Sequence, residues 1–335
     1  NLKAKQDKVG NVLICKPASL GYEDRPTVIL QSHQDMVCEK DATLDHDFMT
    51  QPLETYIEDG WLKAKGTTLG ADDGIGVAMT LAILADNEIK HGPIEALFTV
   101  SEETGLAGAS NLEKDMINGS MLINLDSEDE GEIFIGCAGG INSTIEFNYS
   151  KENVPDNYFF IKLSVDRLHG GHSGDDIDKG FANANKILAR FIYNSLKKYD
   201  IKLCSFNGGN LHNAIPRDAT AVIAIPNNHK EDIRVDYNIY ASDVQAEYHI
   251  TEPEMEFTME SIEKQTTCID NNTAKNFIYA VHAVVNGVYA MSMDMPGLVE
   301  TSSNLASVRT SESTIKIIAS HRSSVMSALT AVRDN

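Results

Sequence analysis

Residues 27–35 read TVILQSHQD, a β-rich run that ends in a histidine and an aspartate two positions apart. Three more segments of the first part of the chain place acidic residues at the end of an apolar run or before one: IEALFTVSEE at 94–103, MLINLD at 121–126 and GADDGIG at 70–76. The strand-like runs alternate with an Ala/Leu/Ile-rich segment at 75–85 that is long enough for a helix. This alternation favours an α/β layer with a largely parallel sheet, in which ligands gather at the carboxyl ends of the strands.

The side chains at these ends form the candidate functional set. If the strands are parallel neighbours, their ends bring together one histidine and about four or five carboxylates. The set is drawn from His33, Asp35, Asp72, Asp73, Glu102, Glu103 and Asp126. So much buried negative charge is prohibitive without compensation, and one or two divalent cations would supply it. Imidazole and carboxylate ligands without a thiolate suit Zn²⁺, Co²⁺ or Mn²⁺.

The spacing leaves alternatives open within this set. His33 and Asp35 point the same way on an extended segment, so either both bind metal or Asp35 accepts the other ring N–H of His33. The neighbouring Glu102 and Glu103 point in different directions, so one can bind metal while the other handles protons. The glycine-rich segment 70–76 also resembles a phosphate cradle, but it carries two acids and no lysine, which makes nucleotide binding the weaker interpretation.

Composition excludes several classes of protein. The chain has 335 residues, 42% of them apolar, so it can bury a core, and its length suits two domains. Its 49 acidic and 28 basic residues give a formal charge of −21, which argues against nucleic acid or an anionic membrane as a partner. The apolar stretch 77–85 is shorter than the roughly 20 residues that a bilayer requires, and we expect no signal peptide. Five cysteines without a C-x-x-C pair argue against a disulfide scaffold and favour the cytoplasm.

The character of the sequence changes near Gly139 and Gly140, so we predict two domains, 1–139 and 140–335. In the second domain we expect strands at 143–147, 159–165, 219–225 and 244–251, and helices at about 182–198, at about 274–290 and from about 323. This order predicts an α+β domain with helices on one face of an antiparallel sheet. We find no internal repeat.

Longer motifs surround the candidate residues. They are SHQDMV at 32–37, TLGADDGIG at 68–76, FTVSEETG at 98–105, NLD at 124–126, LHGGHSG at 168–174, GGNLHNAIPR at 208–217 and GLVETS at 297–302. Together they resemble the di-zinc aminoacylase and dipeptidase family of metallopeptidases, especially its broad-specificity cytosolic dipeptidases. The resemblance covers nearly the whole chain. It implies a zinc-exopeptidase-type mixed sheet with helices on both faces, followed by an α+β lid domain.

The resemblance implies a role for each residue of the metal site. Asp72 would bridge two zinc ions and be joined to Asp73 by a cis peptide. His33 and Asp126 would complete one metal site, and Glu103 would bind the other ion. Asp35 would be the partner of His33. Glu102 would be the general base and acid that moves a proton from an attacking water to the leaving amine.

The resemblance also implies functional residues in the lid. His172 would reach the active site and polarise the scissile carbonyl. Asn213 and Arg322 would hold the substrate, with Arg322 pairing with its free carboxylate. The family's lids often mediate dimers, so a homodimer through this domain is an expectation by analogy.

One departure from the family affects the second metal site. The family completes that site with a histidine near its C-terminus, in a stretch that returns to the catalytic domain after the lid. This sequence ends at Asn335 and shows no match for that histidine or for the family's first helix. We therefore expect an incomplete catalytic domain and a weakly held second metal.

These observations predict a zinc dipeptidase that cleaves unblocked dipeptides, including Xaa-His. One alternative is an N-acyl-amino-acid deacylase with the same site. It would need an apolar pocket where a dipeptidase needs an anion for the substrate's ammonium group. Another alternative is a non-catalytic binding or oligomerisation protein that retains the fold. The intact acidic set argues against that alternative.

Overall fold

The computed structural model describes residues 2–41, 44–127 and 131–335. The chain divides into two compact units, Asn1–Ile133 (unit 1) and Phe134–Asn335 (unit 2). The division falls before the predicted boundary at 139–140. Strand β8 (Gly139–Asn148) pairs from its first residue with Ser323 of unit 2, so the segment before it belongs with that unit.

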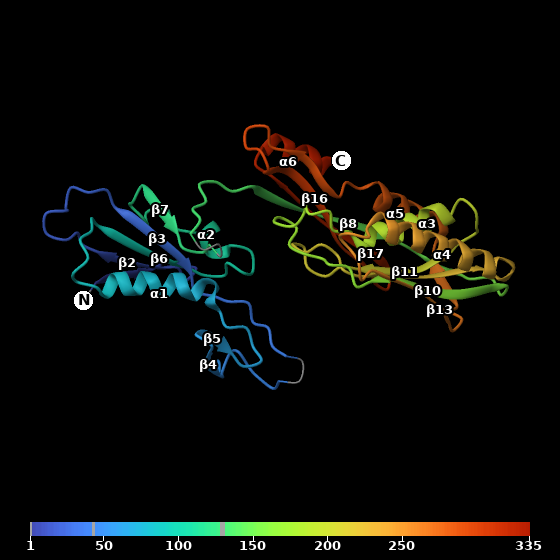
Figure 1. The fold of residues 1–335 in the computed structure, drawn as a ribbon, viewed down its shortest axis with the longest axis horizontal. Coiled ribbons are helices and arrows are strands. Elements are labelled where there is room, and N and C mark those ends of the chain that lie inside the picture. Colours follow the sequence, from blue (N-terminus) through green and yellow to red (C-terminus); the bar gives the residue numbers. More distant parts are fainter. Residues whose placement is uncertain (1, 42–43, 128–130) are drawn as a thin grey trace. The chain divides into compact units, whose positions relative to one another are not determined.

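Unit 1 is built on a five-stranded mixed sheet with the order β1-β2-β6-β3-β7 (Figure 1). Its strands are β1 (Lys3–Gln6), β2 (Val12–Lys16), β3 (Val28–His33), β6 (Ile94–Thr99) and β7 (Met121–Asn124). β3 is parallel to both of its neighbours, whereas β1, β2 and β6 pair antiparallel. The carboxyl ends of β6, β3 and β7 therefore lie at one edge of the sheet, which is what the candidate set requires.

Both faces of this sheet are covered. Alternate residues of β2 and β6 point to opposite faces, so Leu13 and Leu97 belong to one apolar cluster, and Ala96 and Phe98 to the other. Helix α1 (Ala71–Ala85) packs on the second face through Leu84. The first face is covered by the segment that contains α2 (Ala107–Ser110) and continues to Met116. A separate hairpin of β4 (Thr55–Glu58) and β5 (Trp61–Ala64) completes the unit. The mixed α/β architecture is thus confirmed.

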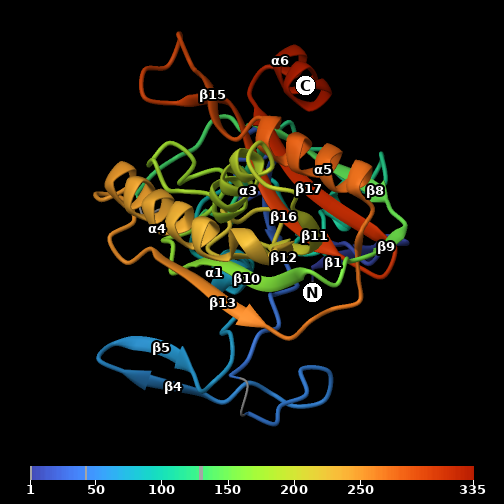
Figure 2. The same cartoon turned by 90° about the vertical axis from the view of Figure 1, so that its right-hand side faces the viewer.

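Unit 2 is an antiparallel sheet with helices packed against it (Figure 2). Seven strands run in the order β13-β10-β12-β11-β16-β17-β8, and β15 pairs with β16 beside them. The strands after β8 are β9 (Lys151–Asn153), β10 (Tyr158–Asp166), β11 (Lys202–Gly208), β12 (Ala219–Pro226), β13 (Glu256–Ile262), β14 (Thr267–Ile269), β15 (Gly287–Met291), β16 (Val299–Thr310) and β17 (Thr314–Ser323). The helices are α3 (Ala184–Ser195), α4 (Lys230–Glu247), α5 (Asn271–Ala283) and α6 (Met326–Asp334), with a short 3₁₀ turn at Asn227–His229. One large apolar cluster joins α3, α4 and α5 to the sheet.

Unit 2 contains a repeat of topology that the sequence did not reveal. In β10-α3-β11-β12-α4, the third strand lies between the first and the second. The same arrangement recurs in β8-α5-β16-β17-α6, where β17 lies between β8 and β16. The two halves meet where β11 pairs antiparallel with β16. Because the first half is inserted between β8 and α5, no simple sequence period exists to be found.

Two predicted elements of unit 2 were wrong. The strand expected at 244–251 is the end of helix α4, whose buried residues Ile233, Tyr237 and Val244 follow the helical spacing. The helix expected at 274–290 ends at Ala283, and its last residues belong instead to strand β15. In both places an apolar run was too short to distinguish a strand from a helix.

Among the described residues, none of the helices combines the length and the apolar character needed to cross a membrane.

Candidate metal centre

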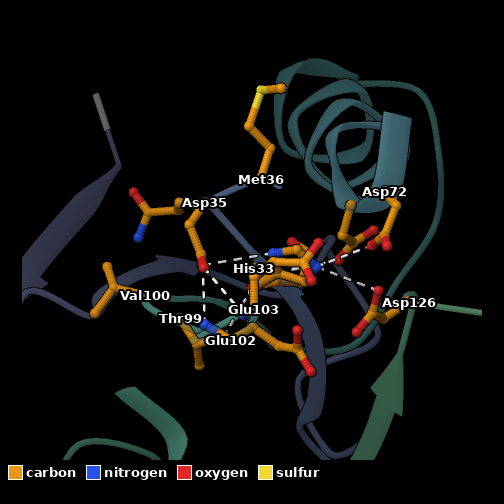
Figure 3. Close-up of polar contacts among 12 residues, drawn as sticks. His33, Asp35, Met36, Asp72, Thr99, Val100, Glu102, Glu103 and Asp126 are labelled. Atoms are coloured by element: carbon orange, nitrogen blue, oxygen red, sulfur yellow. Dashed lines mark hydrogen bonds and ion pairs between the residues drawn. The ribbon is translucent and has the colours of Figure 1, made fainter. Parts of the chain in front are cut away.

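The candidate residues of unit 1 lie together at the carboxyl edge of its sheet (Figure 3). His33 is the last residue of β3, Asp72 lies at the start of α1, and Asp126 follows β7. Glu102 and Glu103 follow β6. The parallel register of β3 with β6 and β7 places these ends side by side. The structure thus brings together what the strand ends predicted.

His33 is the centre of the cluster, and its side chain is 1% exposed. Its Nε2 lies 3.0 Å from Asp72 Oδ1 and 3.5 Å from Asp126 Oδ1. Its Nδ1 faces Asp35 Oδ1 at 3.5 Å. The two ring nitrogens therefore face different carboxylates. Of the two alternatives for Asp35, this geometry favours the one in which Asp35 orients the imidazole from its far side.

Asp35 also ties the two glutamates to the end of β3. Its Oδ1 accepts a hydrogen bond from the backbone N–H of Glu102 at 3.1 Å, and its Oδ2 accepts one from the N–H of Glu103 at 3.2 Å. One carboxylate thus holds the loop after β6 and faces His33. This position suits a residue that supports the site rather than one that binds metal itself.

Asp73 directly follows Asp72 and is fully buried. Its Oδ2 accepts from the backbone N–H of His33 at 3.0 Å, and its Oδ1 accepts from that of Gly76 at 3.1 Å. The Asp72–Asp73 peptide is cis, as the family resemblance implies. A side chain at position 76 would clash with the Asp73 carboxylate. The glycine of this motif therefore allows a close approach to an aspartate, which leaves no reason to assign the segment to phosphate binding.

The donor atoms form two groups that fit a divalent cation. His33, Asp72 and Asp126 offer ligand atoms that all lie within 4.8 Å of one another, and so do His33, Glu102 and Glu103. One imidazole with several carboxylate oxygens is the donor set expected for zinc and related ions. The two groups share His33 as their histidine.

The electrostatics of the cluster agree with a site for cations. Burial and the nearby Asp72 carboxylate raise the pKa of Asp126 to about 7. Burial and the charges of Asp72 and Glu102 also raise the pKa of Glu103. Burial disfavours a charged His33, but the hydrogen bond to Asp72 and the other carboxylates outweigh it and raise the pKa of His33. Burial is the largest cause for the two acids, and the crowded negative charge, which a cation would neutralise, acts in the same direction.

The three candidate residues of the second domain lie near one another within unit 2. An isolated β-bridge joins His172 to Ala214, next to Asn213, and the backbone N–H of Ser173 donates to Asn213 O at 2.7 Å. Arg322, near the end of β17, places Nη2 3.4 Å from His172 Nε2. Within the described residues, the buried Nε of Arg322 makes no hydrogen bond. The three residues selected from the motifs are thus neighbours within unit 2, and their roles stay predictions.

Sequence reasoning overlooked Asp175. Its Oδ2 lies 2.7 Å from Nδ1 of His172, which leaves Nε2 directed toward Arg322. An acidic residue three positions after the histidine was the available signal, but the same spacing occurs in ordinary surface ion pairs.

Comparison with known families identifies the group to which this arrangement belongs. A profile described as peptidase family M20/M25/M40 matches residues 29–323, which include every candidate residue of both units. The chain belongs to the M20 peptidase family. The resemblance inferred from the motifs is therefore confirmed.

Three individual proteins are similar to this chain in sequence or in structure. The cytosol non-specific dipeptidase of Escherichia coli K12 is 42% identical over 313 residues, covering 93% of this chain and 64% of that protein. The crystal structure of an aminoacylhistidine dipeptidase from Vibrio alginolyticus superposes with a TM-score of 0.81 at 40% identity, covering 99% of this chain and 68% of that one. The uncharacterized protein YqjE of Bacillus subtilis is 35% identical over 122 residues, which cover 35% of this chain and 30% of that protein. This chain thus spans less than two thirds of the length of the E. coli relative.

Proposed function

We propose that this M20 peptidase hydrolyses unblocked dipeptides of broad composition, including Xaa-His, in a metal-dependent reaction. The observation that carries the proposal is the pair of donor groups around His33, whose ligand atoms lie within 4.8 Å of one another. The relatives add support, because their names describe a non-specific dipeptidase and an aminoacylhistidine dipeptidase.

The donor set around His33 supports a site for divalent cations, for which we propose two zinc ions, and Co²⁺ or Mn²⁺ would also suit it. In this proposal His33 and Asp126 would hold one ion and Glu103 the other, with Asp72 as a carboxylate common to both. Asp35 orients His33 from the opposite ring nitrogen.

Glu102 handles the proton in this proposal. Bound zinc would supply an activated water, because zinc can lower the pKa of a bound water from 15.7 toward about 7. Glu102 accepts the proton of the attacking water and returns it to the leaving amine. Its backbone is fixed by the hydrogen bond to Asp35, which supports a defined position for its carboxylate. Because Glu102 also belongs to a donor group with Glu103, a role as a metal ligand is the competing assignment.

The residues of unit 2 recognise the substrate in this proposal. Arg322 pairs with the free carboxylate of the dipeptide, Asn213 holds its backbone, and His172 donates to the scissile carbonyl. Within the described residues the buried Nε of Arg322 has no hydrogen-bond partner, which supports the first role because a guanidinium binds a carboxylate through paired N–H groups. The contact between Asp175 and Nδ1 orients the ring of His172, so Nε2, which lies 3.4 Å from Arg322 Nη2, is the nitrogen that would reach the substrate.

The proposal includes a cytoplasmic location and a homodimer formed through unit 2. The name of the E. coli relative supports the location. Exposed apolar side chains on β15 and the loop after it, including Tyr289, Met293 and Met295, support the contact. Light scattering on the full chain measures its mass in solution, and a strictly monomeric protein would contradict the dimer.

The test is amine release from a panel of free and N-acylated dipeptides, measured with zinc and then with a chelator. We expect chelator-sensitive cleavage confined to the free dipeptides. Preference for the acylated substrates would replace the dipeptidase with a deacylase. If zinc is bound and neither class is cleaved, the hydrolase proposal is wrong.

A further inference from the structure

Three polar side chains form a continuous line across the sheet of unit 1 beside the candidate metal centre. Thr99 lies at the end of β6, Gln31 in β3 and Asn124 at the end of β7. Gln31 Nε2 donates to Thr99 Oγ1 at 3.1 Å, and Asn124 Nδ2 donates to Gln31 Oε1 at 2.5 Å. The line thus connects three adjacent strands through side chains alone.

The line ends at a residue of the metal centre. Asn124 Oδ1 accepts a hydrogen bond from the backbone N–H of Asp126 at 3.1 Å, an Asx turn that bends the chain as it leaves β7. The backbone N–H of Leu125 between them donates to Gln31 O at 2.9 Å. Gln31 therefore contacts the turn through its main chain and its side chain.

The orientation of both amides is determined by these contacts. Each amide uses its NH₂ group on one side and its carbonyl oxygen on the other, so neither can flip without losing both bonds. Gln31 and Asn124 are also direct partners in the parallel pairing of β3 with β7. Gln31 precedes His33 by two residues and so lies on the same face of β3. The line of side chains thus has a fixed direction that leads to Asp126.

We propose that Gln31 and Asn124 are positioning residues that hold the Asp126 carboxylate in the geometry needed to bind a divalent cation. The inference rests on the metal centre of the proposed function. The carboxylates of Asp72 and Asp126 both approach Nε2 of His33, at 3.0 and 3.5 Å. Because both carboxylates crowd one ring nitrogen, the direction of the Asp126 side chain depends on a restraint on the loop that carries it. The two amides provide that restraint.

A purely structural role for these amides is the competing explanation, and unit 1 offers a matched control. Asn118 also uses its side-chain amide to join segments of unit 1, because its Nδ2 donates to Glu95 Oε1 at 2.9 Å. It lies before β7, at the opposite end of that strand from Asn124. Replacing either asparagine by leucine removes a side-chain amide of the same kind from the same unit. Only Asn124 is connected to Asp126.

The experiment measures Zn²⁺ affinity and stoichiometry by calorimetry on the full chain, with Co²⁺ absorption spectra as a second readout. We expect Asn124→Leu to weaken one of the binding events by about 10–100-fold, the usual effect of losing an outer partner of a metal ligand. Asn118→Leu is expected to lower the stability of unit 1 and leave zinc affinity unchanged. Equal zinc affinity in Asn124→Leu and the unsubstituted chain would overturn the proposal. So would equal losses in the two leucine variants.

A double-mutant cycle tests whether the two amides act together. Gln31→Met removes both side-chain bonds of Gln31 and leaves the Asx turn intact, so it also serves if Asn124→Leu does not fold. We expect a smaller loss of zinc affinity than for Asn124→Leu, and a double variant that is no weaker than Asn124→Leu alone, because both act through one contact. Additive losses of zinc affinity would show that the two amides act separately and would overturn the proposal. If the unsubstituted chain binds no zinc, the metal centre itself is wrong, a result distinct from normal binding in the variants.

Discussion

A single substitution can decide whether Glu102 is a general base or a metal ligand. Its carboxylate lies in one donor group with His33 and Glu103, whereas the proposal gives the metal to Glu103 and the proton to Glu102. We expect Glu102→Ala to retain bound zinc and to lower kcat by about 10²–10⁴-fold, the typical contribution of a general base. Metal analysis of the purified variant beside its kinetics separates the two functions. A variant that loses zinc together with activity would identify Glu102 as a ligand.

Asp72 is expected to control both ions at once. It is the carboxylate nearest to Nε2 of His33, and in the proposed site it is shared between the metals. We predict that Asp72→Ala binds neither ion, whereas a variant of an unshared ligand such as Asp126→Ala retains one. Zinc content by mass spectrometry of metals gives the count. Full zinc content in Asp72→Ala would rule out the shared role.

For individual residues, the sequence predicted the chemistry of the site better than it predicted the contacts that support the site. The residue types at the strand ends were sufficient to indicate a metal site, because charge of that density needs compensation. The supporting contacts of Asp73 and Asp175 were not predictable. Each depends on how closely two backbone segments approach in three dimensions, and neither spacing is distinctive. Asp73 in particular was adjacent to a predicted ligand, yet it accepts hydrogen bonds from the backbone below the site.

Two glycines of helix α1 allow a test of the contact between the helix and β3, which is made by Asp73. Gly76 lies against the buried Asp73 carboxylate, whereas an added side-chain carbon at Gly74 would meet no atom within 4 Å. We predict that Gly76→Ala destabilises unit 1 by about 1–3 kcal/mol through overpacking. Gly74→Ala should be neutral or stabilising by up to about 1 kcal/mol, because alanine favours a helix. Thermal unfolding of both variants measures the difference, and equal midpoints would contradict the contact.

Glu95 in β6 accepts hydrogen bonds from Asn118 and Gly119 in the segment before β7. This contact should make the stability of unit 1 fall at acid pH. Burial alone would raise the pKa of Glu95, but hydrogen bonds from Asn118 and Gly119 outweigh it and hold the pKa below its usual value. The ionised group therefore stabilises the fold above the unfolded-state pKa of about 4.3, and this contribution is lost as the pH falls through the lower folded-state pKa.

We accordingly predict that Glu95→Gln lowers the stability of unit 1 at pH 7 by about 1–3 kcal/mol. It should also reduce the further loss of stability between about pH 5 and pH 3. Urea unfolding at a series of pH values measures both effects, and the exposed Glu88→Gln is the control. An unchanged pH profile in Glu95→Gln would show that this carboxylate does not contribute.

At the level of elements, the sequence predicted the strands of unit 1 well and the helices of unit 2 unevenly. β3, β6 and β7 are compact apolar runs that end in charged residues, and such boundaries are visible without tertiary information. Helix α4 is rich in charged residues and has only a narrow buried stripe, so its apolar end was mistaken for a strand. The polar, buried strand β16 was not predicted, because its burial comes from partners distant in sequence.

The molecule as a whole should unfold in two steps. Each unit has its own apolar clusters, and all the residues of the two donor groups lie in unit 1. Zinc should therefore stabilise unit 1 alone, by about 2.7 kcal/mol at a free concentration 100 times the Kd. Calorimetry with increasing zinc should show one transition moving to higher temperature and the other unchanged. A single cooperative transition, or equal shifts of both, would contradict this independence.

The inserted half of unit 2 has a consequence for synthesis on the ribosome. Strands β10 to β13 can pair as soon as they emerge, because their partners are near in sequence, except for the contact of β11 with β16. β8 leaves the ribosome first, but its partner is β17, and the bonded pair Ser143 and His321 is 178 residues apart. At a synthesis rate of about 5–20 residues per second, roughly 9–36 s pass between the emergence of β8 and that of β17. The nascent chain thus holds β8 without its partner strand throughout that interval.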